Sequence, residues 1–286
     1  MALAGHDTPT PVFNNTSAAT GYSGPLPGVT AGDLVVVTLH ADGESNTQNT
    51  SAWTVTLGSD TLTFRVGNTG SAPQGLVAIF SGVASASGDQ TLSVTTVNAL
   101  RALAANAFLV TGYDATTPHP NQDQTASTSA FTSVTLPNGV STAADGNAMI
   151  GAIAVHGGDI TGLAVSGADG SSTGQTGSNA NNDCEWGVAW KRTPTVAAVT
   201  FGWTWTGADR RGVAWLEIAA ATGGAASLDA LAYTATLPDL TVAVNTPVGL
   251  DALSYTATLP DVSVAVDTPI ALDAIAYTVT LPDVDV

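Results

Sequence analysis

Few stretches of the sequence have the residue types and spacing of a catalytic motif, and the clearest of them is GSSTG at residues 170–174. It matches the G-x-S-x-G pattern, in which a serine nucleophile lies on a sharp turn between a buried strand and a helix. Here the motif is followed by QTGSNANND, which does not favour a helix, and no histidine lies downstream to act as the general base. The match therefore predicts no hydrolase.

The other residues that could carry chemistry are scattered. The four histidines, at positions 6, 40, 119 and 156, lack the spacing of a metal-ligand set. His40 and His156 each end an apolar stretch close to acidic residues, which is more often ordinary exposed polarity than a site. No phosphate-binding glycine pattern occurs, and glutamate is found only at 44, 185 and 217, few for a glycosidase that needs a carboxylate pair. We expect a non-enzymatic protein without a cofactor.

A polar stretch at 169–183 predicts a long exposed loop and is the candidate contact surface. Its candidate contact residues are Asn179, Asn181, Asn182, Asp183 and Trp186. The six tryptophans also suggest carbohydrate binding, because flat aromatic rings can stack on sugars. Their alternation with glycine and threonine instead predicts that most of them are core residues, with Trp186 and Trp190 lying closest to the polar loop.

A β framework must position these residues. Residues 34–39 are apolar on both alternating faces, which predicts a central strand buried on both sides. Residues 201–206 alternate strictly, with aromatic side chains on one face. About ten to twelve short strands, separated by turn signals, follow one another in this way. We therefore predict an all-β chain whose first domain, residues 1–221, is a jelly-roll-like antiparallel β-sandwich.

A linker at 222–227 leads to a repeat at 228–286, in which LDALAYTATLPDLTVAVNTPVG recurs with a period of 22 residues and the third copy is truncated. Each copy reads as strand, turn, strand, turn, and such short periods indicate a stacked array. The exposed strand edges favour partners. We expect copies from two or three chains to wrap into a fibrous β-stem, a trimer being favoured, with a neighbour completing the last copy. A small Ig-like sandwich and an extended decorating tail are the alternatives.

Acidic residues recur at fixed positions of this repeat. They are Asp229, Asp251 and Asp273 at one position, and Asp239, Asp261 and Asp283 at another. From residue 225 onward there is no lysine or arginine. In an oligomeric stem these positions would form ladders of like charge, which solvent or a cation such as calcium would have to relieve. Ordinary turn chemistry is the alternative, because aspartate after proline is a common turn residue.

The charge balance excludes several classes of partner. The 286-residue chain has a formal net charge of −17 with only six lysines and arginines. Nucleic acid is therefore not expected as a partner, since phosphate binding needs clustered basic residues, and an anionic membrane surface is disfavoured for the same reason. The lone cysteine, Cys184, excludes an internal disulfide. No secretory signal and no apolar run of about 20 residues is visible, so assembly in the cytoplasm of the producing cell is expected.

The order of strand signatures resembles a β-sandwich domain of bacteriophage virion proteins of the minor tail, fibre or spike type. The features are GDL opening a long apolar strand at residue 32, Gly-Tyr-Asp at 112–114, and a final strand RRGVAWLEIA at 210–219. The likeness covers about residues 25–221 and concerns packing, so it carries over no functional residue. It implies a virion protein with an exposed β-built surface.

The sequence thus predicts a non-enzymatic virion component, a fibre, spike or decoration protein on the particle surface. Its expected partners are other virion proteins, further copies of itself as a homo-oligomer and a host surface glycan. The repeat would serve assembly or anchoring, and the sandwich would contact the host. The alternative is a carbohydrate-binding module of a surface or secreted protein, which would be monomeric and would bind glycans through an exposed tryptophan.

Overall fold

The computed structural model describes most of the first 221 residues and the strands of the repeat. The described residues are 4–5, 10–15, 17–42, 48–70, 75–136, 142–156, 161–176, 184–193, 196, 199–221, 231–235, 239–244, 253–257, 261–266 and 275–279. The chain divides into two compact units, Met1–Ala221 and Thr222–Val286. Within the described residues the only helical element is the short 3-10 turn η1 (Thr50–Ala52). The all-β prediction is confirmed, and none of these residues forms a helix able to span a membrane.

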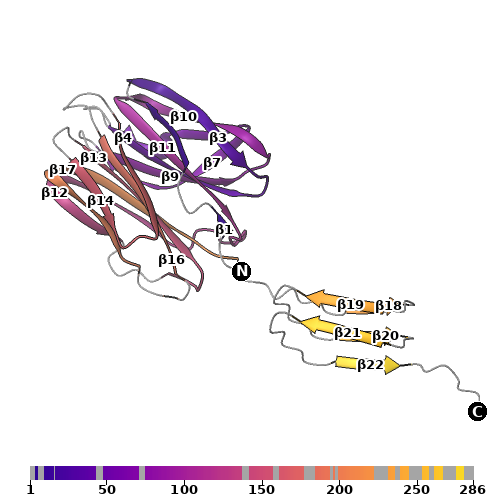
Figure 1. Ribbon diagram of the computed structural model, residues 1–286. Helices are drawn as coiled ribbons and strands as arrows, with labels where there is room; N and C mark the ends of the chain where they lie inside the picture. The colour runs from indigo at the N-terminus through magenta and orange to yellow at the C-terminus, as the bar shows by residue number, and fades with distance from the viewer. Residues whose placement is uncertain are drawn as a thin grey trace, which may run out of the picture. The chain divides into compact units, whose positions relative to one another are not determined.

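The first sheet of unit Met1–Ala221 has nine strands, all antiparallel (Figure 1). Its order is β1-β11-β4-β9-β7-β6-β10-β3, and β2 also pairs with β11. The strands are β1 (Ala4–Gly5), β2 (Thr10–Asn15), β3 (Ala19–Val29), β4 (Leu34–Asp42), β6 (Thr54–Leu57), β7 (Asp60–Gly67), β9 (Gly75–Val83), β10 (Gly88–Leu100) and β11 (Ala102–Thr111). A small ribbon joins β5 (Gln48–Asn49) to β8 (Thr69–Gly70).

The second sheet has six strands in the order β12-β17-β13-β16-β15, with β14 also paired to β17. The strands are β12 (Gln122–Leu136), β13 (Ala148–His156), β14 (Thr161–Ser166), β15 (Gly170–Thr176), β16 (Cys184–Arg192) and β17 (Phe201–Ile218). The loop predicted at 169–183 is therefore wrong over β15, which pairs along its whole length with β16. Gly174 allows this, because the ring of Trp186 packs where a Cβ would lie.

Three apolar cores fill the unit. The N-terminal core consists of side chains of the nine-stranded sheet and its connections, among them Val37 of β4 and Leu92 of β10. The central core lies between the two sheets and includes Val36 of β4 and Leu216 of β17. The C-terminal core consists of side chains of the six-stranded sheet and its connections, packed around Trp203. Since β4 contributes to two cores, every residue of it is buried, which confirms the predicted central strand.

The two sheets repeat one arrangement. The middle strand is β4 in one and β13 in the other, each nine residues long and paired with a neighbour on both sides. The pairs at its first residue are Leu34 with Val110 and Val83, and Ala148 with Ile218 and Arg192. The first part of β17 takes the place of β10 and its last part that of β11. Asp42 and His156, the last residues of β4 and β13, are therefore equivalent positions.

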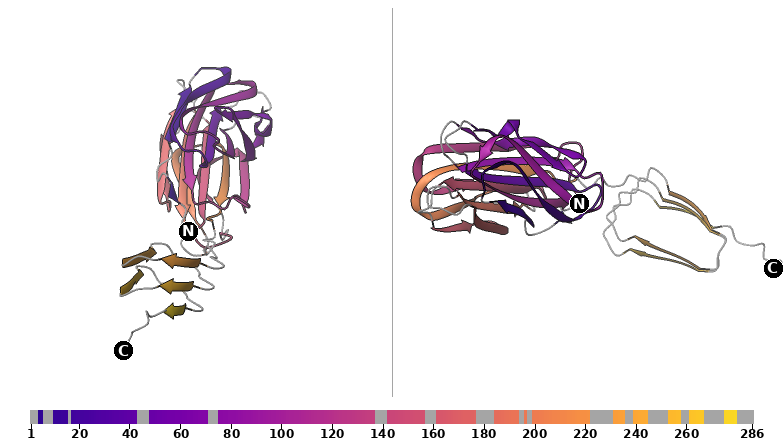
Figure 2. Two further views of the ribbon diagram at one scale, coloured as in Figure 1. Left: turned by 90° about the vertical axis from the view of Figure 1, so that its right-hand side faces the viewer. Right: turned by 90° about the horizontal axis from the view of Figure 1, so that it is seen from above.

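The repeat unit forms two parallel sheets within one chain (Figure 2). One contains β18 (Leu231–Ala235), β20 (Leu253–Ala257) and β22 (Ile275–Val279), and the other contains β19 (Asp239–Val244) and β21 (Asp261–Val266). Equivalent residues of successive copies pair directly, as in Tyr233 with Tyr255 and Asp239 with Asp261. The expected stacking of the copies thus occurs inside the chain. The parallel pairing contradicts the small Ig-like alternative, which is antiparallel.

Candidate functional site

Of the five predicted contact residues, four lie outside the described residues and one is buried in the core. Asn179, Asn181, Asn182 and Asp183 lie outside the described residues. Trp186 is wrong as an exposed contact, because only 6% of its surface is accessible. Its ring packs in the central core against His40 of β4, with the ring centroids 5.5 Å apart. Burial follows from the position of Trp186 on the face of β16 turned toward the nine-stranded sheet.

All six tryptophans are buried, with exposures from 1 to 8%. Trp186 and Trp190 are in the central core and Trp53 is in the N-terminal core. The other three are in the C-terminal core. The prediction that the tryptophans are core residues is therefore confirmed. The indole rings that suggested carbohydrate binding are thus packed inside the cores of this fold.

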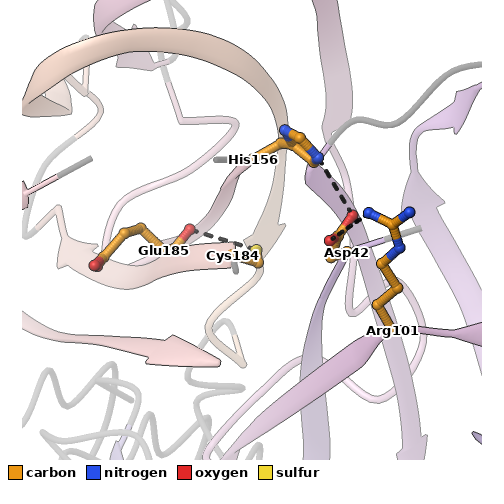
Figure 3. Close-up of polar contacts among 5 residues, drawn as sticks. All are labelled: Asp42, Arg101, His156, Cys184 and Glu185. Carbon is orange, nitrogen blue, oxygen red and sulfur yellow. Dashed lines mark hydrogen bonds and ion pairs between the residues drawn. The ribbon is translucent and has the colours of Figure 1, made fainter. Parts of the chain in front are cut away.

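The candidate functional site is a charged cluster where β4 and β13 end (Figure 3). The carboxylate of Asp42 is fully buried and lies between two basic side chains. One carboxylate oxygen is 4.0 Å from Nη1 of Arg101, and the other is 3.8 Å from Nε2 of His156. The backbone N–H of Arg101 also donates to the Asp42 carbonyl oxygen at 3.1 Å. Asp42 and Arg101 come from the first sheet, whereas His156 comes from the second.

This geometry is suited to holding the two sheets together. A carboxylate in the interior is costly unless opposite charges and hydrogen bonds compensate for lost hydration. The Arg101 guanidinium supplies a permanent positive charge on one side of the carboxylate, and the His156 imidazole lies on its other side, from the second sheet. The cluster therefore brings together side chains from the ends of two equivalent strands.

Cys184 lies beside this cluster, as the strand partner of His156 in the β13–β16 pair. Its thiol is fully buried and donates to the carbonyl oxygen of Glu185, with the sulfur 3.5 Å from that oxygen (Figure 3). The thiol is therefore shielded from solvent and from the reagents that a reactive cysteine must reach. Among the described residues, no group of three or more His, Cys, Asp and Glu side chains is placed to hold a metal ion.

His40 links the same strands deeper in the central core. Its Nδ1 is 2.9 Å from the carbonyl oxygen of Ile153 on β13, and its Nε2 is 3.0 Å from the hydroxyl of Thr38. Complete burial lowers the pKa of His40 to about 4, although the bond to Ile153 opposes this shift. The ring is therefore neutral at pH 7, with Nδ1–H donating to the carbonyl and Nε2 accepting from the hydroxyl.

A second histidine joins the sheets near the other ends of the strands. Nε2 of His119 is 2.7 Å from the hydroxyl of Ser81 on β9, which also accepts a 2.8 Å hydrogen bond from Nε of Arg65. Burial, assisted by the charge of Arg65, lowers the pKa of His119 to about 4. The pair has the donor and acceptor of a nucleophile and its base. Yet Ser81 is fully buried, so this network fixes the connection between the sheets.

Glu217 of β17 fixes that same end of the unit. Its buried carboxylate accepts hydrogen bonds from the side-chain amides of Asn121 and Asn147 and from the backbone N–H of Ala143. The carbonyl oxygen of Glu217 lies 3.4 Å from Nδ1 of His119. A buried carboxylate with three donors is compensated by hydrogen bonds rather than by a cation.

Stability is expected to fall as the pH is lowered from 6.5 toward 4, because of His40. Its folded pKa lies below the ordinary value of 6.5, so the unfolded chain binds more protons in this window. The contribution of the neutral His40 ring to the free energy of unfolding is fully present above pH 6.5 and is lost as the pH falls. The loss reaches about 3 kcal/mol at pH 4. Urea unfolding at several pH values should show a shallower pH dependence for His40→Gln than for the wild type. Equal dependence in both proteins would contradict this role.

The sequence indicated the parts of the charged cluster but not their meeting. His40 and Asp42 are visible at the end of one apolar stretch, and His156 at the end of another. What the sequence does not reveal is that these stretches are equivalent strands packed across one core. The equal lengths of β4 and β13, and of β9 and β16, were the available signal.

Comparisons with known proteins leave the family open. No family model matches the chain, and no curated protein matches it either. One similar solved structure is a conserved protein of unknown function from Pseudomonas aeruginosa PAO1. It is 13% identical, with a TM-score of 0.25, and the match covers 70% of this chain and 76% of that one. A likeness at this level carries no argument about function, and what the chain does must be inferred from its own geometry.

Proposed function

We propose that this protein is a non-enzymatic structural component of a phage or phage-like virion, such as a fibre, spike or decoration protein. In this proposal the repeat unit assembles or anchors the protein, and the unit Met1–Ala221 is displayed on the particle and faces the host. The observation that carries the proposal is the in-register parallel stacking of the repeats. The resemblance of residues 25–221 to virion β-sandwich domains is the reason for proposing that the assembly is a virion.

The stacking supports assembly because the stack is open at both ends in the described strands. β18 and β22 each pair on one side only, as do β19 and β21. A strand edge presents unpaired N–H and C=O groups, and natural proteins cover such edges, blunt them or use them for association. Stacked repeat arrays likewise need a cap or a neighbour at each end. A repeat with free edges is thus an association surface.

The sandwich supports display on an exposed particle. Its three cores and the polar networks of Asp42, His119 and Glu217 bind the two sheets into one unit. Charged residues form only 10% of the chain, and the polar surface is mostly uncharged. Such a surface, together with a net negative charge, favours solubility when many copies are crowded together.

Deletion of residues 222–286 tests the proposal. The full chain is expected to sediment as an oligomer, and the truncated protein as a folded monomer with unchanged tryptophan fluorescence, since all six tryptophans lie in Met1–Ala221. In particle preparations, the truncated form should be lost from the assembled fraction. A truncated protein that still assembles, or a full chain that stays monomeric and never sediments with particles, would refute the proposed function.

A further inference from the structure

In the larger sheet of the repeat, each strand pairs with the next strand in the same register, so that equivalent residues of successive copies lie side by side. Ala232 of β18 pairs with Ser254 of β20, and Ser254 pairs with Ala276 of β22. The three strands LAYTA, LSYTA and IAYTV are nearly the same phrase. The smaller sheet follows the same rule, since DLTVAV of β19 pairs residue by residue with DVSVAV of β21. The edge of each strand therefore pairs with the equivalent strand of the next repeat.

We propose that the partner of the repeat is a second copy of this chain, added end to end, with β22 of one copy paired in parallel to β18 of the next. This inference rests on the proposed assembly role and specifies its geometry. The free edge of β22 repeats the edge that β20 offers to β22. The strand that fits such an edge in the same register is a first repeat, and β18 has its outer edge free among the described strands.

Parallel addition is favoured over pairing of two β22 strands. The repeat has two sheets, and in both of them equivalent residues of successive copies pair in parallel. Head-to-tail addition keeps this strand direction and this register. Two β22 strands related by a two-fold axis would run antiparallel, and the β19–β21 sheets of the two copies would then not continue one another in direction or register. A head-to-tail contact is heterologous and therefore propagates instead of closing.

Engineered cysteines test this register. In the full chain carrying Ala232→Cys and Ala276→Cys, the two positions are two strand spacings apart, about 9.6 Å, which is too far for a disulfide within one copy. Across the proposed contact they are one spacing apart, about 4.8 Å, which is within disulfide reach. Mild oxidation should give a ladder of covalent multimers on non-reducing gels. The wild type, with the buried Cys184 alone, is the matched control and should give none.

The single variants separate the possible outcomes. Mixing the Ala232→Cys protein with the Ala276→Cys protein should give one covalent dimer, whereas neither protein alone should cross-link. Dimers of Ala276→Cys alone would show antiparallel pairing of β22 and would overturn the inference, as would covalent dimers of Ala232→Cys alone. An oligomer that requires residues 222–286 but forms none of the expected links would also overturn it, while leaving the proposed function standing. A full chain that is monomeric at every concentration would refute both.

Discussion

Replacing Gly75 with alanine is expected to destabilise the unit Met1–Ala221 by about 3 kcal/mol or more, or to prevent it from folding. A Cβ at this position would lie 2.0 Å from the carbonyl oxygen and 2.3 Å from the carbonyl carbon of Ala154 on β13. Both atoms belong to the backbone of a fully paired strand, so neither can move aside alone. The two sheets would have to separate along the central core.

The contact is tight from the other direction too. A Cβ on Gly212 of β17 would meet the carbonyl oxygen of Gly75 at 2.3 Å and the side-chain amide of Asn68 at 2.5 Å. That amide donates a 3.1 Å hydrogen bond to the Gly75 carbonyl and is buried. Gly75 thus lies where β9, β13, β17 and Asn68 approach closely, and its substitution disturbs both sheets.

Urea unfolding followed by tryptophan fluorescence measures the effect, since the fluorescence reports only the unit that contains Gly75. Gly21→Ala is the matched control: Gly21 lies in β3, where a Cβ would meet nothing within 4 Å, and its loss should change stability by less than about 0.5 kcal/mol. If Gly75→Ala unfolded at the same urea concentration as the control, the close approach of β9 and β13 would be wrong.

The sequence predicted the strands well because period-two alternation depends only on local packing. Residues 34–39 are apolar on both faces, and β4 is buried on both. Two of the features that suggested virion domains meet in the fold: the hydroxyl of Tyr113, from Gly-Tyr-Asp, donates to the carbonyl oxygen of Gly32, the glycine of GDL, 81 residues earlier. The sequence shows each feature but not this contact.

Long-range relations could not be predicted in the same way. The β15 strand consists of small residues that carry no strand signal of their own, and it forms because β16 offers an edge and Trp186 fills the space above Gly174. The meeting of Asp42 with His156 requires that two sheets pack with equivalent strand ends together. Pairing of this kind depends on tertiary context, which overrides local preference.

Replacing Glu217 with leucine is expected to destabilise the unit by about 2–4 kcal/mol, because it leaves the buried amide of Asn147 and the two less buried donors of Asn121 and Ala143 without their acceptor. The carboxylate accepts from Asn121, Ala143 and Asn147, which belong to two connecting segments and the start of the strand that follows them. Removing it therefore removes more than one contact. The substitution would detach two segments from β17: the segment that joins the two sheets, and the turn that precedes β13.

Glu217→Gln separates the role of shape from that of charge. The glutamine amide keeps one oxygen for the Ala143 N–H and the Asn147 amide, and Asn121 can rotate to present its own oxygen to the new NH2 group. We expect a smaller loss than for leucine, about 1–2 kcal/mol. The exposed Asp123→Ala, on the neighbouring strand β12, is the control and should change stability by less than about 0.5 kcal/mol.

Comparing these variants in urea decides what Glu217 does. A leucine variant as stable as the wild type would mean that the three donors find other partners and that Glu217 fixes nothing. Equal losses for leucine and glutamine would mean that the negative charge itself, not the number of acceptors, is needed. The expected order of stability, leucine well below glutamine and glutamine below Asp123→Ala, follows only if one buried carboxylate holds two separate segments of the chain by three hydrogen bonds. Its weakening would then loosen the joint between the two equivalent sheets while each core stays packed.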